Sequence, residues 1–598
     1  MNIDIFIVLI YFAFLMAVGW MFRSASSSTS DYFRGGGKML WWMVGSTAFM
    51  TALSAMTFTG VMGKALTSGL SIVVIFFANA LGYFCNYLFF AAKARQMRVI
   101  SPIQGVRMRF GPVSEQVFTW ATVPSSVLQA SLWLNALAIF ASAVFDIPIS
   151  NTIISAGLVV LFMSLIGGSW AVVASDFLQM IIITVVTFIA TIVAIWKAGG
   201  VMPILDKGLT VEPFVGDGYS YGYLFVGWFI CIFVKQFFST NNMIDSYRFV
   251  AAKDTRNARK AAILACVLMA VGPFIWFLPA WYVAGVYPDT STWGLEALGN
   301  KVTDATYFVF VRNEMPLGMV GLMMSAMFAA TMSSMDSALN RNAGIFIKNV
   351  YEPYINKNAS EKKLMFASKV TTIVFGLLII FAGLLMSELK GFGLFDALML
   401  VSTLVAFPVL IPSLLCFFIR KTPDWSGWAT ILVGACVSAV IAFVITPEMI
   451  QSIFDLPTAL SAREFAEMKS ITMGVTGHIF ITGGFFLCTQ FFYKEPVGER
   501  AKEINKFFTN VATPVVVKTT QQTIDMDSKQ QSLLGKVLLS ASLCLSLMVL
   551  IPNPMWGKLL YILMSLIIGA IGILLLRASK QHAEIESEVE SIEDVVIN

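Results

Sequence analysis

The strongest candidates for binding chemistry are small and hydroxyl-bearing side chains in the apolar segment 322–346. Four of them are spaced i, i+3, i+4 and i+7 and therefore share one helix face: Ala330, Ser333, Ser334 and Ser337. Asp336 lies beside that face. Hard cations such as sodium are bound by several oxygen atoms with little formal charge, which hydroxyls and backbone carbonyls supply. Packing alone would not explain Asp336, so the segment predicts a cation site.

A second segment, 41–69, is crowded with Gly, Ser and Thr. Such residues allow a membrane helix to break where it lines a cavity, and the carbonyls of the break can hold a cation. Close packing of helices through small residues explains the same composition. The segment alone favours neither interpretation.

An aspartate also lies deep inside an apolar segment, where ionisable groups are costly and therefore suggest function. Asp176 is about two turns into a helix expected to begin near Ser169, with Gln179 one turn further. Such a carboxylate could pair with an arginine or cap a backbone turn. Its depth favours an ion or proton relay.

Lys235 lies near the middle of the apolar segment 221–247. About fourteen residues separate it from either end, roughly 20 Å of helix, which is beyond the reach of a snorkelling lysine. It either pairs with Asp245 or Asp396 or meets an anionic substrate. The sequence leaves these alternatives open.

The composition places these residues in a membrane protein. Of 598 residues, 57% are hydrophobic and 13% charged, far from the charged fraction of about a quarter in soluble domains. The net charge of +5 is small, and basic residues form short runs between apolar stretches, so we expect no nucleic-acid partner. The seven cysteines lie in apolar segments without a CxxC pair or paired histidines, which indicates neither disulfides nor zinc.

A membrane-spanning helix needs roughly 20 apolar residues, and by that measure about fifteen segments qualify. Their predicted spans are 3–21, 39–66, 68–92, 117–145, 148–167, 171–196, 221–247, 261–286, 316–347, 364–387, 394–419, 427–446, 471–493, 533–551 and 557–576. The first lacks the charged leader and cleavage site of a signal peptide, so we expect it to remain. Lys and Arg concentrate in loops after odd-numbered segments, which predicts an inner (plasma) membrane protein with its N-terminus outside and its C-terminus in the cytoplasm.

Four motifs then carry a family resemblance: DYFxGGGKMxWW at 31–42, Leu53-Ser54-Ala55 with a following Gly60, GGxxAVxxSDxxQ at 167–179, and AxxSS at 330–334. In this order and spacing, over roughly residues 1–495, the sequence resembles the sodium:solute symporter family of sugar, proline and sialic acid cotransporters. The resemblance implies an all-α polytopic membrane protein with a LeuT-type five-plus-five inverted repeat. One extra helix precedes the repeats and about four follow them.

The resemblance, together with the apolar segments and the polar stretches between them, divides the chain into seven regions. They are an N-terminal helix and loop (1–38), the first repeat (39–197), the second repeat (221–420), accessory helices (425–493), a polar cytoplasmic linker (494–532), C-terminal helices (533–577) and an acidic tail (578–598). No polar stretch is long enough for a soluble enzyme or kinase domain, so we expect no attached signalling domain.

Within the repeats, the resemblance implies two ion sites. Sodium is expected on backbone carbonyls and hydroxyls of Met50, Leu53, Ala330, Ser333 and Ser334. A second cation is expected near Asp176 and Ser337, but Asp336 stands where a hydroxyl would be expected. The second site therefore holds either sodium or a proton shared between carboxylates.

The substrate positions depart further from the family's sugar site. Thr57, Phe76, Asn79 and Met269 occupy the places of its polar and charged residues. Lys235 would replace the missing cation and favours an acidic sugar such as a uronate. The expected substrate residues are Ser54, Thr57, Asn79, Lys235 and Asn242.

We therefore expect sodium-driven uptake of a small organic solute, with sodium as the only metal and no obligate protein partner. The alternatives are an amino-acid or organic-acid symporter and a transporter-fold sensor, against which the short tail argues. The sequence shows neither the pore-lining ring of a channel nor the nucleophile, base and metal constellation of an enzyme.

Overall fold

The computed structural model describes residues 3–22, 35–167, 169–209, 214–216, 218–388, 393–517 and 521–597. This part of the chain is helical almost throughout, and each predicted apolar segment contains helix. Ten of its helices are long and apolar enough to cross a membrane, and a bent pair makes eleven. The predicted all-α polytopic fold is confirmed, because a helix satisfies its backbone groups within the segment when no water is present.

The first half of the chain begins with α1 (Ile3–Phe22) and a helix in two pieces, α3 (Trp41–Ala52) and α4 (Met62–Ser68). The helices that follow are α5 (Val74–Cys85), α6 (Ala91–Gln96), α7 (Pro102–Phe145), α8 (Ile149–Gly167), α9 (Ser169–Ala198) and α10 (Val201–Gly208). Helix α7 begins well before the predicted position 117, and Gly111 with φ +81° turns the chain within it.

The second half begins with another interrupted helix, α11 (Gly222–Asn241) and α12 (Tyr247–Val250). It continues with α13 (Thr255–Val286), α14 (Thr306–Glu314), α15 (Met319–Phe346), α16 (Glu361–Ser387), α17 (Leu394–Leu400) and α18 (Phe407–Leu415). Beyond it lie α19 (Ser426–Phe443), α20 (Pro447–Ile453), α21 (Ala462–Glu467), α22 (Gly474–Gly477), α23 (Gly484–Cys488), α24 (Gly498–Ala512), α25 (Gln521–Leu547) and α26 (Met555–Ile597).

Both halves therefore open on a broken helix. Leu53 is extended (φ −104°, ψ 123°) where α3 ends, and helix resumes at Ala55. Asn242 is likewise extended (φ −85°, ψ 162°) where α11 ends, and turns lead to α12. Each break frees carbonyls that a continuous helix would have used.

Glycines bring the interrupted helices close to their neighbours. A Cβ on Gly45 of α3 would lie 2.9 Å from the carbonyl oxygen of Ala261 on α13. On Gly82 of α5, it would lie 2.4 Å from Thr240 Oγ1 on α11. Larger side chains at these positions would push the broken helices away from their supports.

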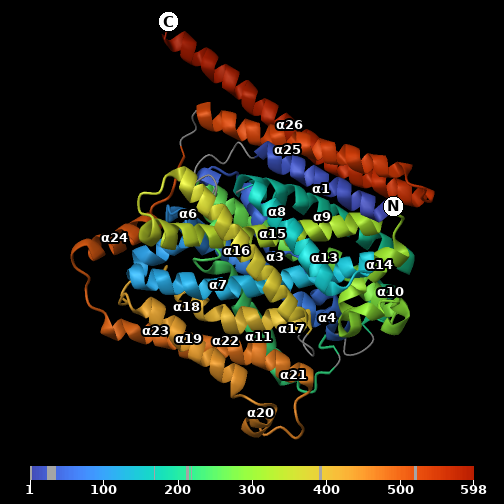
Figure 1. The fold of residues 1–598 in the computed structure, drawn as a ribbon, viewed down its shortest axis with the longest axis horizontal. Helices are drawn as coiled ribbons and strands as arrows, with labels where there is room; N and C mark the ends of the chain where they lie inside the picture. Colours follow the sequence, from blue (N-terminus) through green and yellow to red (C-terminus); the bar gives the residue numbers. More distant parts are fainter. Residues whose placement is uncertain are drawn as a thin grey trace.

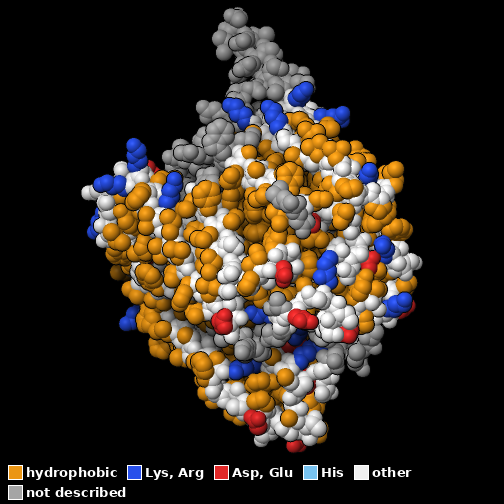
Figure 2. All heavy atoms as spheres, turned by 45° about the vertical axis from the view of Figure 1, so that its right-hand side comes forward, with side chains coloured by type: hydrophobic (Ala, Val, Ile, Leu, Met, Phe, Trp, Pro, Cys, Tyr) orange, Lys and Arg blue, Asp and Glu red, His pale blue; other side chains and the backbone are white. Residues whose placement is uncertain are grey.

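The remaining helices surround this core (Figure 1). Helices α25 and α26 run side by side and pack against α9, and the end of α26 projects from the molecule. The polar region 494–532, predicted as a linker, is largely helical. It contains α24, which packs on α6 and α7, and the beginning of α25 at Gln521. Figure 2 shows hydrophobic side chains over much of one side, as contact with lipid requires, and charged side chains lie mostly towards its edges and lower part.

Candidate functional site

A cavity of about 230 Å³ lies between the two broken helices. Its wall combines α3, α5, α7, α11, α12, α15 and the bent pair α17–α18. Apolar side chains such as Phe76 and Met399 line one part, and hydroxyl and amide side chains such as Ser126, Gln129 and Ser239 line another. Such a mixture is typical of a site for a small polar ligand.

Ser334 lies where the first break meets α15. Its hydroxyl is 3.2 Å from the carbonyl oxygen of Ala330, 3.3 Å from those of Met50 and Leu53 and 3.5 Å from that of Thr51. One hydroxyl has a single proton to donate, so it cannot satisfy four carbonyls. Converging carbonyls with a hydroxyl form a ligand set suited to a hard cation.

Ser333 faces a different neighbour. Its buried hydroxyl has no hydrogen-bond partner in the described part of the chain and lies opposite the carboxylate of Asp176 on α9. Thr47 of α3 faces the same carboxylate. The structure thus brings Met50, Leu53 and Ala330 together around Ser334, whereas Ser333 points towards α9.

Asp176 is fully buried, and within the described chain neither of its carboxylate oxygens has a hydrogen-bond partner at normal distance, although the hydroxyls of Ser333 and Thr47 lie close enough to interact with it. The Tyr11 hydroxyl and the side-chain amide of Gln179, which lie near each other, are likewise buried without such a bond to another described residue. Buried polar groups are almost always paired with protein, water or an ion. A buried carboxylate beside two hydroxyls offers the kind of oxygen ligands that a hard cation prefers.

The other two residues expected at the second cation site have their own partners. Asp336 accepts a short hydrogen bond from Ser164 of α8, and Thr51 donates to Ser337 at 3.5 Å. Asp336 is near enough to Asp176 for their charges to interact. No hydrogen bond joins the three predicted residues to one another within the described chain.

Lys235 lines the cavity from α11 and is only 3% exposed. Its ammonium group lies 3.7 Å from the sulfur of Met399, and no carboxylate of the described residues forms an ion pair with it. Asp245 pairs with Arg341 at 2.6 Å and Asp396 pairs with Lys64 at 3.3 Å. Both carboxylates that the sequence offered to Lys235 are therefore bound elsewhere.

Three further predicted substrate residues, Ser54, Thr57 and Asn79, line the cavity, as does Phe76. Met269 is buried away from it. Asn242 is also outside the lining, because its amide closes the second break: it donates to the carbonyl of Ser239 at 3.0 Å and accepts from the Asp245 N–H at 2.9 Å.

The sequence analysis missed several lining residues: Gln129, Trp133, Gln236, Arg248 and Arg341. Arg341 could have been found, because it is an arginine inside a predicted span and the argument applied to Lys235 covers it. Gln129 and Trp133 lie one turn apart on α7, and nothing in their surrounding sequence marks them.

Ion pairs of Lys64 connect α4 to two other helices near the cavity. Its ammonium group on α4 contacts Asp396 of α17 at 3.3 Å and Glu467 of α21 at 3.8 Å, and Arg463 pairs with the same Glu467 at 2.9 Å. A Cβ on Gly63 would lie 2.7 Å from Oδ1 of Asp304, which places this carboxylate beside α4. These contacts hold α4 against the bent pair.

Comparison with known proteins agrees with this architecture. The chain is 26% identical over 427 residues to a sodium/sialic acid symporter of Aliivibrio fischeri, covering 69% of this chain and 82% of that protein. It is 27% identical over 451 residues to a sodium/glucose cotransporter of Vibrio parahaemolyticus, covering 70% and 81%. A solved structure of a Na⁺-coupled sialic acid symporter in a substrate-bound outward-open state matches with a TM-score of 0.65 at 20% identity, covering 80% of this chain and 98% of that one. The model of the sodium:solute symporter family matches residues 32–434, and the chain belongs to that family.

Proposed function

We propose that this symporter couples inward sodium flux to uptake of a small acidic sugar, such as a uronate. Relatives that carry the names of sialic acid and glucose symporters support a sugar-type solute. The negative charge is inferred from Lys235, which is the observation that carries the proposal.

An ammonium group removed from water without a counter-ion is unfavourable by several kcal/mol. Among the described residues, the sulfur of Met399 is the only hydrogen-bond partner of the Lys235 ammonium group. A carboxylate of the solute would supply the missing charge, while Thr57 and Asn79 offer hydrogen bonds to sugar hydroxyls from the same cavity. Phe76 and Trp133 offer apolar surface for a sugar ring.

Sodium in this proposal binds at Ser334 and the carbonyls of Met50, Leu53 and Ala330. Its positive charge would hold the end of α3 against α15 and so fix the wall of the solute cavity. Entry of each sodium down a potential of 100 mV supplies about 2.3 kcal/mol. Since roughly 1.4 kcal/mol is a factor of ten, one ion supports almost fifty-fold accumulation of a neutral solute.

A second cation is proposed at Asp176, with the hydroxyls of Ser333 and Thr47 as further ligands. Support comes from the unpaired, fully buried carboxylate. If two sodium ions enter with one singly charged anionic solute, each transport cycle moves net positive charge inward. Membrane potential would then drive uptake even of an anion.

We further propose that the protein works without an obligate partner, through the two units 39–197 and 221–420, with its C-terminus in the cytoplasm. Each unit begins with a broken helix that borders the cavity. The basic loops after odd-numbered segments support the orientation. A single cysteine introduced at the exposed Lys502 of α24, in a variant whose seven native cysteines are replaced by alanine, would test it by labelling in sealed right-side-out vesicles, where protection is expected.

The test is uptake by the purified protein in proteoliposomes. We expect an inward sodium gradient to accumulate labelled D-glucuronate and to accumulate D-glucose far less. Equal uptake with potassium in place of sodium would contradict sodium coupling. Preference for glucose over glucuronate would contradict the acidic substrate, and a parallel set of amino acids and organic acids identifies the alternative solute classes.

A further inference from the structure

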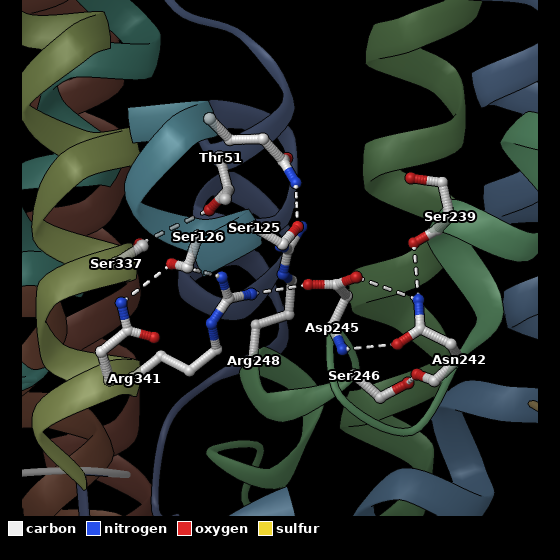
Figure 3. A network of polar contacts seen from close by, with 12 residues as sticks. Thr51, Ser125, Ser126, Ser239, Asn242, Asp245, Ser246, Arg248, Ser337 and Arg341 are labelled. Atoms are coloured by element: carbon white, nitrogen blue, oxygen red, sulfur yellow. Dashed lines mark hydrogen bonds and ion pairs between the residues drawn. The ribbon is translucent and has the colours of Figure 1, made fainter. Parts of the chain in front are cut away.

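Two arginines and one aspartate lie together on the cavity wall near the second break (Figure 3). Arg248 comes from α12, Arg341 from α15, and Asp245 from the turn between α11 and α12. The two guanidinium groups lie 5.5 Å and 5.6 Å from the ring centre of Tyr247. Two positive charges therefore share one aromatic side chain, and one of them, Arg341, is paired with the carboxylate of Asp245.

The carboxylate of Asp245 forms a direct ion pair with Arg341. Nη1 of Arg341 lies 2.6 Å from Oδ1 of Asp245, and Nη2 donates to Ser126 Oγ at 3.1 Å. The other carboxylate oxygen accepts from the amide of Asn242 at 3.0 Å. Asp245 nevertheless retains 30% exposure of its side chain, so it borders the open cavity and water can reach it.

Arg248 has N–H groups that are not used in hydrogen bonds to other described residues. One of its terminal nitrogens donates to the carbonyl oxygen of Ala48 and to the hydroxyl of Tyr83, both at 3.1 Å. Its Nε is buried and has no partner among the described residues. A guanidinium carries five N–H donors, so the two arginines together offer more than Asp245 can accept.

This arginine pair and Lys235 line one continuous cavity. Between Lys235 and the end of α11 at Asn241 there are six residues of rise, roughly 9 Å of helix. The loops that follow α12 carry the basic residues that predict the cytoplasmic side. A solute released from Lys235 towards the cytoplasm would pass the arginine pair.

We propose that Arg341 and Arg248 form a second carboxylate-binding position on the exit route, and that Asp245 is a built-in competitor for it. The proposal rests on the proposed function, in which the solute is an anion. The leaving carboxylate exchanges with Asp245 on Arg341, so the Arg341 guanidinium keeps an anionic partner throughout the step. Asp245 then returns to Arg341 and displaces the solute, which prevents the exit position from becoming a trap.

Competition explains why an aspartate lies beside an anion route. Without Asp245, the two guanidinium groups could each bind a carboxylate through two parallel hydrogen bonds and would hold it tightly. With it, the net charge of the group is +1, and each step of release replaces one ion pair by another of similar chemistry. Arg341 and Asp245 are therefore positioning residues for release, distinct from the deep cation Lys235.

The test measures anion binding to the purified full-length protein in a Lys235→Met background, which removes the deep cation. D-Glucuronate is the probe and D-glucose its neutral control, with binding read from thermal stabilisation in sodium-containing buffer. We expect weak glucuronate-specific binding in Lys235→Met, loss of it on adding Arg341→Gln, and at least tenfold tighter binding on adding Asp245→Asn. Lys502→Gln, which removes an exposed cation on α24, serves as the matched control and should change nothing.

Two outcomes would overturn the exit position: glucuronate binding that survives Arg341→Gln, or binding that Asp245→Asn leaves unchanged. Arg341→Lys keeps the charge and guards against misfolding, and it should retain part of the binding. Failure of the proposed function looks different. If Lys235→Met binds glucuronate as tightly as the wild type, the deep anion site is refuted, while the response to Asp245→Asn still decides the exit position.

Discussion

Replacing Lys235 by Met is the sharpest test of the solute site, because it removes a charge and keeps the length and apolar stem of the side chain. Lys235 is 3% exposed and has no ion-pair partner among the described residues. A hydrogen bond to a charged group contributes about 1.5 to 3 kcal/mol. At about 1.4 kcal/mol per factor of ten, affinity for an acidic solute should fall roughly 10- to 140-fold.

The same substitution should act in the opposite direction on stability. A buried ammonium without a counter-ion is unfavourable, so its removal should raise the melting temperature of the solute-free protein. Lys64→Met is the matched control, because Lys64 is also a lysine on a helix near the cavity but contacts Asp396 and Glu467. Its removal leaves Asp396 without its ion-pair partner and Glu467 with Arg463 alone, and should lower the melting temperature.

The assay pairs thermal unfolding in detergent with sodium-driven competition uptake of glucuronate and glucose. Loss of glucuronate affinity together with a raised solute-free melting temperature would support a solute ligand. Unchanged glucuronate affinity would refute that role. A lowered melting temperature of solute-free Lys235→Met would instead show that the ammonium group of Lys235 stabilises the folded protein.

The remaining predictions concern ions and protons. Ser334→Ala should raise the sodium concentration for half-maximal uptake by roughly tenfold, on the scale of one charged contact. Ser333→Ala should act mainly on binding of the second cation. Sodium titrations of uptake distinguish the two substitutions, and equal effects would contradict separate sites. Asp176→Asn should raise stability in sodium-free buffer and reduce the stabilisation that sodium adds, as thermal unfolding at several sodium concentrations will show. Burial raises the pKa of Asp304, in the loop before α14, to about 7. Because the folded protein then holds a proton that the unfolded chain releases near pH 4, wild-type stability should fall as pH rises from about 4 to 7; Asp304→Asn should remove that part of the slope, and identical pH profiles would contradict it.

Much of the fold could be predicted from local properties of the sequence. Apolar segments of spanning length located the helices, and the spacing of Ser334 from Ala330 predicted a shared helix face. The small residues around Leu53 indicated a break, which the structure contains. These features depend only on residues within one segment, whose helical period and length are fixed by backbone geometry.

The sequence was less informative where a polar region looked like a linker. Region 494–532 contains α24 and the start of α25 because its few apolar residues, such as Ile504 and Phe507, are buried against other helices. Their burial depends on a surface supplied by α6 and α7. No property of the segment alone reveals that surface.

Which charges meet was decided only by tertiary structure. Asp245 and Asp396 were equally good partners for Lys235 in the sequence, yet they pair with Arg341 and Lys64, which are 96 and 332 residues away from them. The adjacent serines 333 and 334 were predicted as ligands of one ion, yet they face different helices. The sequence alone determined which costly polar groups enter the membrane. Their pairing depends on how each helix is rotated and shifted against its neighbours, and packing of the whole bundle sets that rotation.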